Sequence, residues 1–314
     1  MQTPCAVAVR PEGGQPFEVF VAERGAGRIV RVVANHRDSS NEAITQFPRN
    51  SSDQNTPDSP GLQSFCFLDH SRLVAAGGGE DGKPFVRLYE LQDLADPLKF
   101  DESKYPADLL ASDASRKDGV ASFHDMARTR ANDRVTDNLL LASVGKGGPG
   151  GLWKVPIRAN TLGDIMPVES TASKDDSQPV GGVAVGVTGT LSVATTAQIS
   201  GNKNAVIRFL NPINGRALLE IPTDLKNIVG LAYSPSSGDL FVANFDFSDK
   251  SASGIYRIDD DSEVGKPACH VTKVAAVPRP TSLTVAADGT LYVTALGESG
   301  NGNHSGELLQ LTVK

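Results

Sequence analysis

The sequence predicts an all-β fold, a six-bladed β-propeller whose four-stranded antiparallel blades surround a central channel. The first observation is a pair of residues, an aliphatic residue followed by Ala or Thr, that recurs six times at intervals of roughly 50 to 70 residues. The second is an apolar segment after each pair that contains Arg, Lys or Gln. The third is the lack of a long segment with helical periodicity. The six pairs are Val21-Ala22, Val74-Ala75, Leu141-Ala142, Val193-Ala194, Val242-Ala243 and Val293-Thr294.

Residues 228–258 show the repeating unit most clearly. Residues 230–233 alternate as a strand, and the turn chemistry of residues 234–238 connects them to a second strand at 240–243. Gly254 precedes a third strand, and in most units a fourth apolar run follows. The expected blades are residues 5–47, 62–110, 120–169, 180–225, 228–277 and 280–314, within one propeller domain that spans residues 1–314.

Each expected third strand is apolar on both faces, as a middle strand between packed blades should be. We expect its basic residue to lay the aliphatic stem between blades and to keep the charged head at an edge, rather than to join a ring of binding cations. The third-strand segments are residues 29–32, 85–88, 152–155, 206–209, 255–258 and 308–311.

Closure of the ring is expected to be irregular, because only three strands follow Pro280. Either the sixth blade lacks an outer strand, or a segment upstream of Met1 supplies it. Hydrogen bonds from residues 1–4 to the outside of residues 308–313 would instead show that the N-terminus closes the ring. An unpaired outer edge favours strand addition or aggregation.

Charge and composition restrict the partners. The net charge of −7 and a pI of about 5.3 argue against nucleic acid as a partner. No segment is long and apolar enough to span a membrane. We expect no signal peptide, so the protein is either cytoplasmic or extracytoplasmic after removal of an export segment. The odd number of cysteines predicts three partly buried thiols, at Cys5, Cys66 and Cys269.

Two segments carry a resemblance to known propellers. Residues 230–244, GLAYSPSSGDLFVAN, and residues 283–293, LTVAADGTLYV, are similar to the first and second strands of NHL-repeat and gluconolactonase-like propellers. The resemblance implies the six-bladed fold, which hosts many functions. In the gluconolactonase branch a divalent cation sits at the channel mouth, and a carboxylate that ends a second strand is among its ligands. Here Asn244 stands at that position, and Thr3-Pro4-Cys5 replaces the Glu-Gly-Pro motif of the first blade.

Four polar residues are expected at one mouth of the channel. First strands line a propeller channel, and alignment of the six places Asp125 where the other blades have a small residue. His124 directly precedes Asp125, and second strands end on the same face with Glu23 and Asn244. We therefore predict a ligand-binding site of Glu23, His124, Asp125 and Asn244. The small residues of the other blades are Ala6, Ser64, Gly182, Gly230 and Ser282.

The oxygen-bearing members of this set, Glu23, Asp125 and Asn244, form a candidate site for Ca²⁺ or Mg²⁺. With His124 added, the set would also suit a transition metal, and His124 is the candidate general base. In the alternative, Asp125 pairs with a nearby arginine at position 128 or 130, and His124 is an exposed loop residue.

Two functions remain open, and the sequence does not decide whether the protein is an enzyme. In the first, a binding or scaffold propeller presents polar loops to a small molecule or a protein partner. In the second, a metal-dependent lactonase or esterase acts through a cation at the channel mouth. A quinone-dependent dehydrogenase would need a dense set of His and Arg residues that the sequence lacks. The loops that support the first function are residues 23–27, 77–82, 145–151, 195–204, 244–254 and 296–306.

Overall fold

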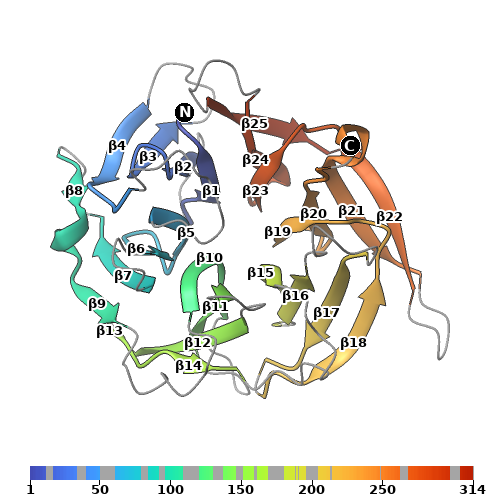
Figure 1. The fold of residues 1–314 in the computed structure, drawn as a ribbon, viewed down its shortest axis with the longest axis horizontal. Helices are drawn as coiled ribbons and strands as arrows, with labels where there is room; N and C mark the ends of the chain where they lie inside the picture. Colours follow the sequence, from blue (N-terminus) through green and yellow to red (C-terminus); the bar gives the residue numbers. More distant parts are fainter. Residues whose placement is uncertain are drawn as a thin grey trace.

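The computed structural model confirms an all-β, six-bladed β-propeller, with six mainly antiparallel sheets in a ring around a channel (Figure 1). Two short 3₁₀ turns, η1 (Phe100–Glu102) and η3 (Lys250–Ala252), occur among the described residues. In this part of the chain no helix is long and apolar enough to span a membrane. The structure describes all residues except 12–16, 34–39, 50–60, 79–83, 92–95, 109–119, 130–136, 146–150, 159–160, 169–179, 188, 190, 196–203, 213, 248, 262–267, 298–304 and 314.

Each blade begins at the channel and proceeds outward. The inner strands are β1 (Pro4–Val9), β5 (Gly61–Phe67), β10 (Val120–Thr129), β15 (Val180–Val185), β19 (Ile228–Tyr233) and β23 (Pro280–Val285). The second strands are β2 (Glu18–Glu23), β6 (Arg72–Gly78), β11 (Asn138–Gly145), β16 (Leu191–Thr195), β20 (Leu240–Asn244) and β24 (Thr290–Leu296). The third strands are β3 (Arg28–Val33), β7 (Pro84–Glu90), β12 (Gly151–Arg158), β17 (Val206–Leu210), β21 (Gly254–Asp260) and β25 (Gly306–Thr312).

Five blades also have outer strands, of unequal regularity. In blade three the outer position is divided between two short strands, and β8 (Leu98–Lys99), from the β7–β9 connection, adds in parallel to β4 of blade one. The outer strands are β4 (Ser40–Thr45), β9 (Tyr105–Asp108), β13 (Thr161–Leu162) with β14 (Met166–Pro167), β18 (Ala217–Pro222) and β22 (Cys269–Ala275).

A β-bulge at the same point of every inner strand fixes the alignment of the blades. The pairing of inner and second strands skips one residue in each blade. His124 is the skipped residue of blade three, and Asp125 follows it. The residues after the six bulges are Ala6, Ser64, Asp125, Gly182, Gly230 and Ser282, which confirms the inner-strand alignment from the sequence.

The inner strands converge closely enough to require small residues. A Cβ atom at Gly182 would lie 2.5 Å from Leu231 Cδ1 and 3.2 Å from Asp125 Oδ2. A Cβ atom at Gly230 would lie 3.2 Å from Leu283 Cδ2. The carboxylate of Asp125 therefore occupies space that the absent side chain of Gly182 leaves open.

The marker pairs lie on the second strand in all six blades. The observed strand registers differ from the alignment made from the sequence in blades two and four. In blade two, the position equivalent to Val21 is Ala75 rather than Val74. In blades two and four, the basic residue of the third strand, Arg87 or Arg208, lies one position earlier than in the other blades. Because side chains alternate along a strand, these two residues point to the opposite blade face. The sequence could not show this shift, because third strands are apolar on both faces.

Several basic residues of the third strands pair within their own blade. Arg31 forms an ion pair with Glu18 of the neighbouring strand. Arg208 Nε lies 2.8 Å from Glu220 Oε1 on β18. Each of these two cations is thus paired with a carboxylate on an adjacent strand.

The hydrophobic core is divided among the interfaces between neighbouring blades. Phe20 and Ile29 of blade one pack in one cluster with Leu73 and Tyr89 of blade two. Polar contacts cross the same interface, where Cys5 Sγ lies 3.4 Å from the Leu62 carbonyl oxygen. All three cysteines are partly buried free thiols, as predicted.

The sixth sheet has three strands among the described residues, so its irregularity is confirmed. Among the described residues, the first two residues of the chain pair with the last strand of this sheet at the start of β25. Gln2 forms an antiparallel bridge with Ser305, and the Gly306 N–H donates to the Met1 carbonyl oxygen at 2.8 Å. Hydrogen bonds along residues 308–313, which would have contradicted the predicted irregular closure, are not among those that the first residues make in the described part of the chain.

Candidate functional site

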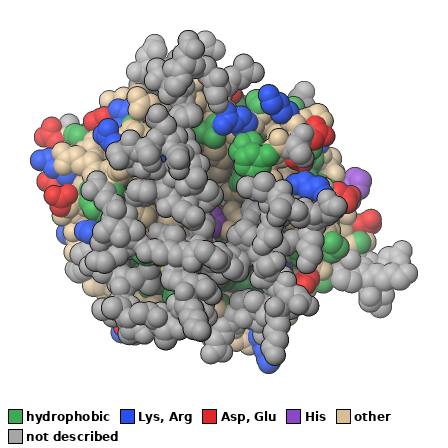
Figure 2. All heavy atoms as spheres, viewed as in Figure 1, with side chains coloured by type: hydrophobic (Ala, Val, Ile, Leu, Met, Phe, Trp, Pro, Cys, Tyr) green, Lys and Arg blue, Asp and Glu red, His purple; other side chains and the backbone are tan. Residues whose placement is uncertain are grey.

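The central channel holds a cavity of about 210 Å³, lined by residues of all six inner strands. Histidine atoms are visible at the centre of the disc in Figure 2. Asp125, Arg128 and Tyr233 contribute polar groups to the lining. Arg128 Nε donates to Asp137 Oδ1 at 2.9 Å, so its ion pair is made with Asp137 rather than with Asp125. The other arginine of the predicted alternative, at position 130, lies outside the described residues.

Asp125 connects two blades through backbone hydrogen bonds. Its Oδ1 accepts from the Met126 N–H at 2.9 Å, and its Oδ2 accepts from the Val183 N–H of the next blade at 2.8 Å. The side chain lines the channel and is partly buried by the surrounding protein. This burial raises the pKa of Asp125 to about 7, against the opposing effect of the two N–H donors. A carboxyl group so placed changes its protonation near neutral pH.

His124 is the bulge residue of β10, not an exposed loop residue. At the equivalent position of blade six, Thr281 Oγ1 donates to the Pro4 carbonyl oxygen of the next blade at 2.9 Å. In the same way, His124 of blade three is hydrogen-bonded to the backbone of Val180 in blade four. Val180 holds in blade four the position that Pro4 holds in blade one. Burial lowers the pKa of His124 to about 4, so the imidazole is neutral at pH 7. Its Nδ1 atom is buried and has no hydrogen-bond partner among the described residues.

Glu23 is buried at the end of β2 and is neutralised by cations of its own blade. Arg28 Nε donates to Glu23 Oε2 at 2.6 Å, and the Gln2 N–H donates to Oε1 at 3.1 Å. The terminal amino group of Met1 lies 3.9 Å from the same Oε1 atom. Glu23 thus joins the chain's first residues to β3.

Asn244 is buried at the end of β20 and uses both ends of its amide. Its Oδ1 accepts from the Lys226 and Asn227 N–H groups at 3.2 and 3.1 Å. Its Nδ2 donates to the Ala252 carbonyl oxygen at 2.8 Å. A carboxylate could not make this last bond, which gives a structural reason for Asn where the gluconolactonase pattern has Asp.

The polar contacts given above connect each of the four predicted residues to groups of its own blade or of the next blade. His124 and Asp125 are adjacent in β10, and both bond to the backbone of β15. Glu23 and Asn244 bond to groups of blades one and five. Across the described ranges, no three His, Cys, Asp or Glu side chains are grouped to hold a metal ion. The metal site and the general base stay predictions, which metal analysis of the purified protein would test.

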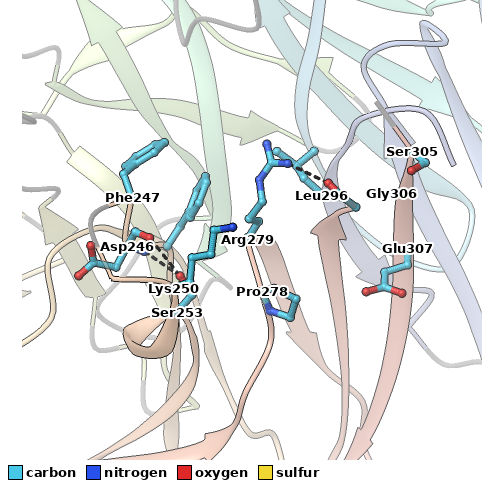
Figure 3. Close-up of a pocket in the computed structure, with 12 residues that line it drawn as sticks. Asp246, Phe247, Lys250, Ser253, Pro278, Arg279, Leu296, Ser305, Gly306 and Glu307 are labelled. Carbon is cyan, nitrogen blue, oxygen red and sulfur yellow. Dashed lines mark hydrogen bonds between the residues drawn. The ribbon is translucent and has the colours of Figure 1, made fainter. Parts of the chain in front are cut away.

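A second candidate site is a pocket of about 430 Å³ between blades five and six, shown in Figure 3. The loop after β20 forms one wall, and the segment that leads into β23 forms the floor beside it. The far wall is the end of β24 and the start of β25. The lining residues are Phe245, Asp246, Phe247, Lys250, Ser253, Pro278, Arg279, Leu296, Gly297, Ser305, Gly306 and Glu307.

Two aromatic rings and a guanidinium group define this pocket. The rings of Phe245 and Phe247 have centroids 4.3 Å apart, and Phe247 is 64% exposed. Arg279 Cζ lies 6.0 Å from the Phe245 centroid, within reach of a cation–π contact, and Arg279 donates to the Gly297 carbonyl oxygen at 2.8 Å. Arg279 also has a backbone φ of 52°, which is uncommon outside glycine and is often found at functional positions.

The aromatic loop is held by a local network around Asp246. The Asp249 N–H donates to Asp246 Oδ1 at 3.0 Å, and the Asp246 N–H donates to Ser253 Oγ at 3.0 Å. Both Asp246 and Ser253 are buried. The exposed ring of Phe247 therefore projects from a constrained loop, which reduces the entropy that a ligand must overcome on binding.

The loop at 244–254 was predicted from the sequence to bind, but the role of its aromatic residues was not predicted. The signal was Phe245-Asp-Phe247, two aromatic residues in a polar loop of a chain with only 6% aromatic residues. Arg279 gave no comparable signal, because its role depends on contacts with two other loops. Of the other loops predicted to bind, residues 79–83, 146–150, 196–203 and 298–304 lie outside the described part of the chain.

Comparison with known proteins supports the fold without assigning a family. No protein-family profile and no curated protein sequence matches this chain. A solved structure described as glucose dehydrogenase has a TM-score of 0.63 at 15% identity, covering 100% of this chain and 97% of that one. The WD40 β-propeller domain of Doa1 has a TM-score of 0.52 at 10% identity, with coverage of 94% and 90%. The Cps50 (Swd1) propeller domain of Myceliophteria thermophila has a TM-score of 0.56 at 13% identity, with coverage of 94% and 80%.

These likenesses show the propeller fold alone. The similar structures include a WD40 propeller and a dehydrogenase, so they do not separate binding from catalysis. The resemblance to NHL-repeat and gluconolactonase-like propellers stays a prediction.

Proposed function

We propose that this protein is a binding propeller and that the pocket between blades five and six is its ligand site. The observation that carries this proposal is the exposed ring of Phe247, which lies beside the ring of Phe245 at the wall of a pocket of about 430 Å³. Small-molecule sites commonly have volumes of about 300–1,000 Å³ and are mostly apolar with a few convergent polar groups. The loop that carries both rings belongs to the face predicted for binding.

The chemistry of the lining indicates the kind of ligand. The aromatic rings suit a flat apolar group, and Arg279 and Lys250 supply positive charge beside it (Figure 3). Asp246 and Glu307 supply carboxylates elsewhere in the lining. We expect a small molecule, or a side chain of a protein partner, that combines a planar ring with an acidic or hydrogen-bonding group.

Anilinonaphthalene sulfonate tests the site, because it joins fused apolar rings to an anionic group. We expect the probe to bind with one site for each chain, and Phe247→Ala to weaken its binding by at least about tenfold, since a lost aromatic contact commonly costs more than about 1.4 kcal/mol. Leu218→Ala is the matched control, because Leu218 on β18 is 65% exposed and does not line the pocket. Equal binding by the two variants would overturn the proposed site.

A further inference from the structure

The third strand of blade six, β25, is the last strand of its sheet, whereas every other blade continues outward. Figure 1 shows β25 without an outer partner, between the outer strands β4 and β22 of the flanking blades. This holds for the described residues, in which blade six contains β23, β24 and β25. Blade six therefore has an outer edge at the position of a third strand.

Leu308 shows what this edge lacks. It pairs with Thr294, the residue that corresponds to Ala22 in blade one, and it is partly exposed. The equivalent residue of each other blade is at most 4% exposed beneath an outer strand. Leu308 thus holds a position that an outer strand buries in the other blades, and blade six has no such strand among the described residues. The five equivalents are Ile29, Val86, Leu152, Ile207 and Ile255.

The backbone of β25 also presents hydrogen-bonding groups outward. The Gly306 N–H donates to Met1 outside the sheet, and the N–H of its partner Leu296 donates toward Arg279 on the inner side. Leu296 and Gly306 therefore face each other without exchanging hydrogen bonds. Since such pairs alternate along an antiparallel ladder, the N–H and C=O groups of Leu308, Gln310 and Thr312 also point outward. The outward groups form one continuous row of donors and acceptors.

An antiparallel strand already begins at this edge. Gln2 bridges Ser305 in antiparallel orientation, and the Met1 carbonyl oxygen accepts from Gly306. Among the described residues this pairing involves Ser305 and Gly306 and does not include Leu308. A strand that continued it would run antiparallel to β25 and would lie opposite residues 307–312.

We propose that the outer edge of β25 is a strand-addition site for one extended segment of a partner protein, bound antiparallel to β25 with an aliphatic residue opposite Leu308. In each of the five other blades the residue opposite the Leu308 position is aliphatic, with alanine included. On β4, most of the other outer-strand positions are polar. The five aliphatic residues are Ile44, Ala107, Val168, Ile221 and Ala275.

The shape of the edge favours a single strand over a second copy of this chain. Because β25 holds a third-strand position, its edge is set back by one strand spacing, about 4.8 Å, from the outer strands β4 and β22. Two copies with edges set back in this way would meet at their flanking blades before their β25 strands came within pairing distance. A lone extended segment fits the gap.

A peptide with the sequence of β4, SNEAIT, tests the proposal, because its Ile is the residue that covers Ile29 in blade one. We expect the peptide to slow hydrogen–deuterium exchange of the Leu308 and Thr312 amides by at least about tenfold at saturation. The peptide SNEANT, which lacks the aliphatic residue, should give much weaker protection. Gln310→Pro should abolish the effect, since it removes an outward N–H and leaves the ladder to β24 intact.

Gln310→Thr is the matched control, because it changes the same side chain and keeps the N–H. Thermal unfolding would verify that Gln310→Pro is folded, and Thr312→Pro replaces it if it is not. Absence of protection in the wild-type protein, or equal protection in the proline variant, would overturn the proposal. A concentration-dependent dimer that the proline variant disperses would assign the edge to a second copy and would also overturn it.

Discussion

Asp125 should make the protein less stable as the pH rises toward neutrality, and Asp125→Asn should remove this dependence. Burial raises the pKa of Asp125 from 3.8 to about 7 in the folded protein. Between these two values the unfolded chain has released a proton that the folded chain still holds, so each pH unit lowers the free energy of unfolding by about 1.4 kcal/mol. The full effect is about 4 kcal/mol, an upper limit because the side chain lines the channel and is partly exposed to solvent screening.

The contribution of Asp125 is therefore fully present below pH 4 and lost as the pH passes through 7. Asp125→Asn also loses an acceptor for one of the Met126 and Val183 N–H groups, which costs about 1–3 kcal/mol at every pH. The variant should thus be less stable than the wild-type protein at pH 5, and the difference should shrink or change sign by pH 8.

Urea unfolding at pH 5, 6, 7 and 8, followed by the fluorescence of Trp153, measures this difference. Trp153 is the single tryptophan of the sequence and is buried in the same blade as Asp125. Asp239→Asn, at an exposed turn, controls for the loss of a carboxylate. A difference between wild type and Asp125→Asn that stays constant from pH 5 to pH 8 would refute the reasoning from burial.

Two further predictions concern packing and hydrogen bonding near the channel. Gly182→Ala should lower stability by about 1–3 kcal/mol, because its Cβ would lie 2.5 Å from Leu231 Cδ1, whereas Gly186→Ala, with its nearest contact at 3.4 Å, should be nearly neutral in the same urea titration. Asn244→Ala should cost about 2–4 kcal/mol and lower Tm, because it leaves two buried N–H groups and the Ala252 carbonyl without their partner. Asn244→Asp keeps the acceptor and loses the donor, so its Tm should lie between those of the wild-type protein and Asn244→Ala. A Tm of Asn244→Asp equal to that of the wild-type protein would contradict this account.

The sequence by itself determined the number and order of the blades and the alignment of their inner strands. Alternating apolar residues and turn residues are local signals, and six repetitions make them strong. Small residues at five of six inner positions identified Asp125 as the exception, and the shared bulge places it there. A count of strands after Pro280 was enough to predict the irregular closure of blade six, which has three strands among the described residues.

Only the tertiary structure decided what the polar side chains contact. Glu23 pairs with Arg28 and the N-terminus, and Asn244 closes two loops, because these partners come from segments whose approach no local pattern encodes. The pocket beside Phe247 likewise unites three segments from residues 245–253, 278–279 and 296–307. A strand follows from its own alternation, but the partner of a buried polar group is set by whichever neighbour satisfies its hydrogen bonds, and the folding of the ring brings that neighbour into place.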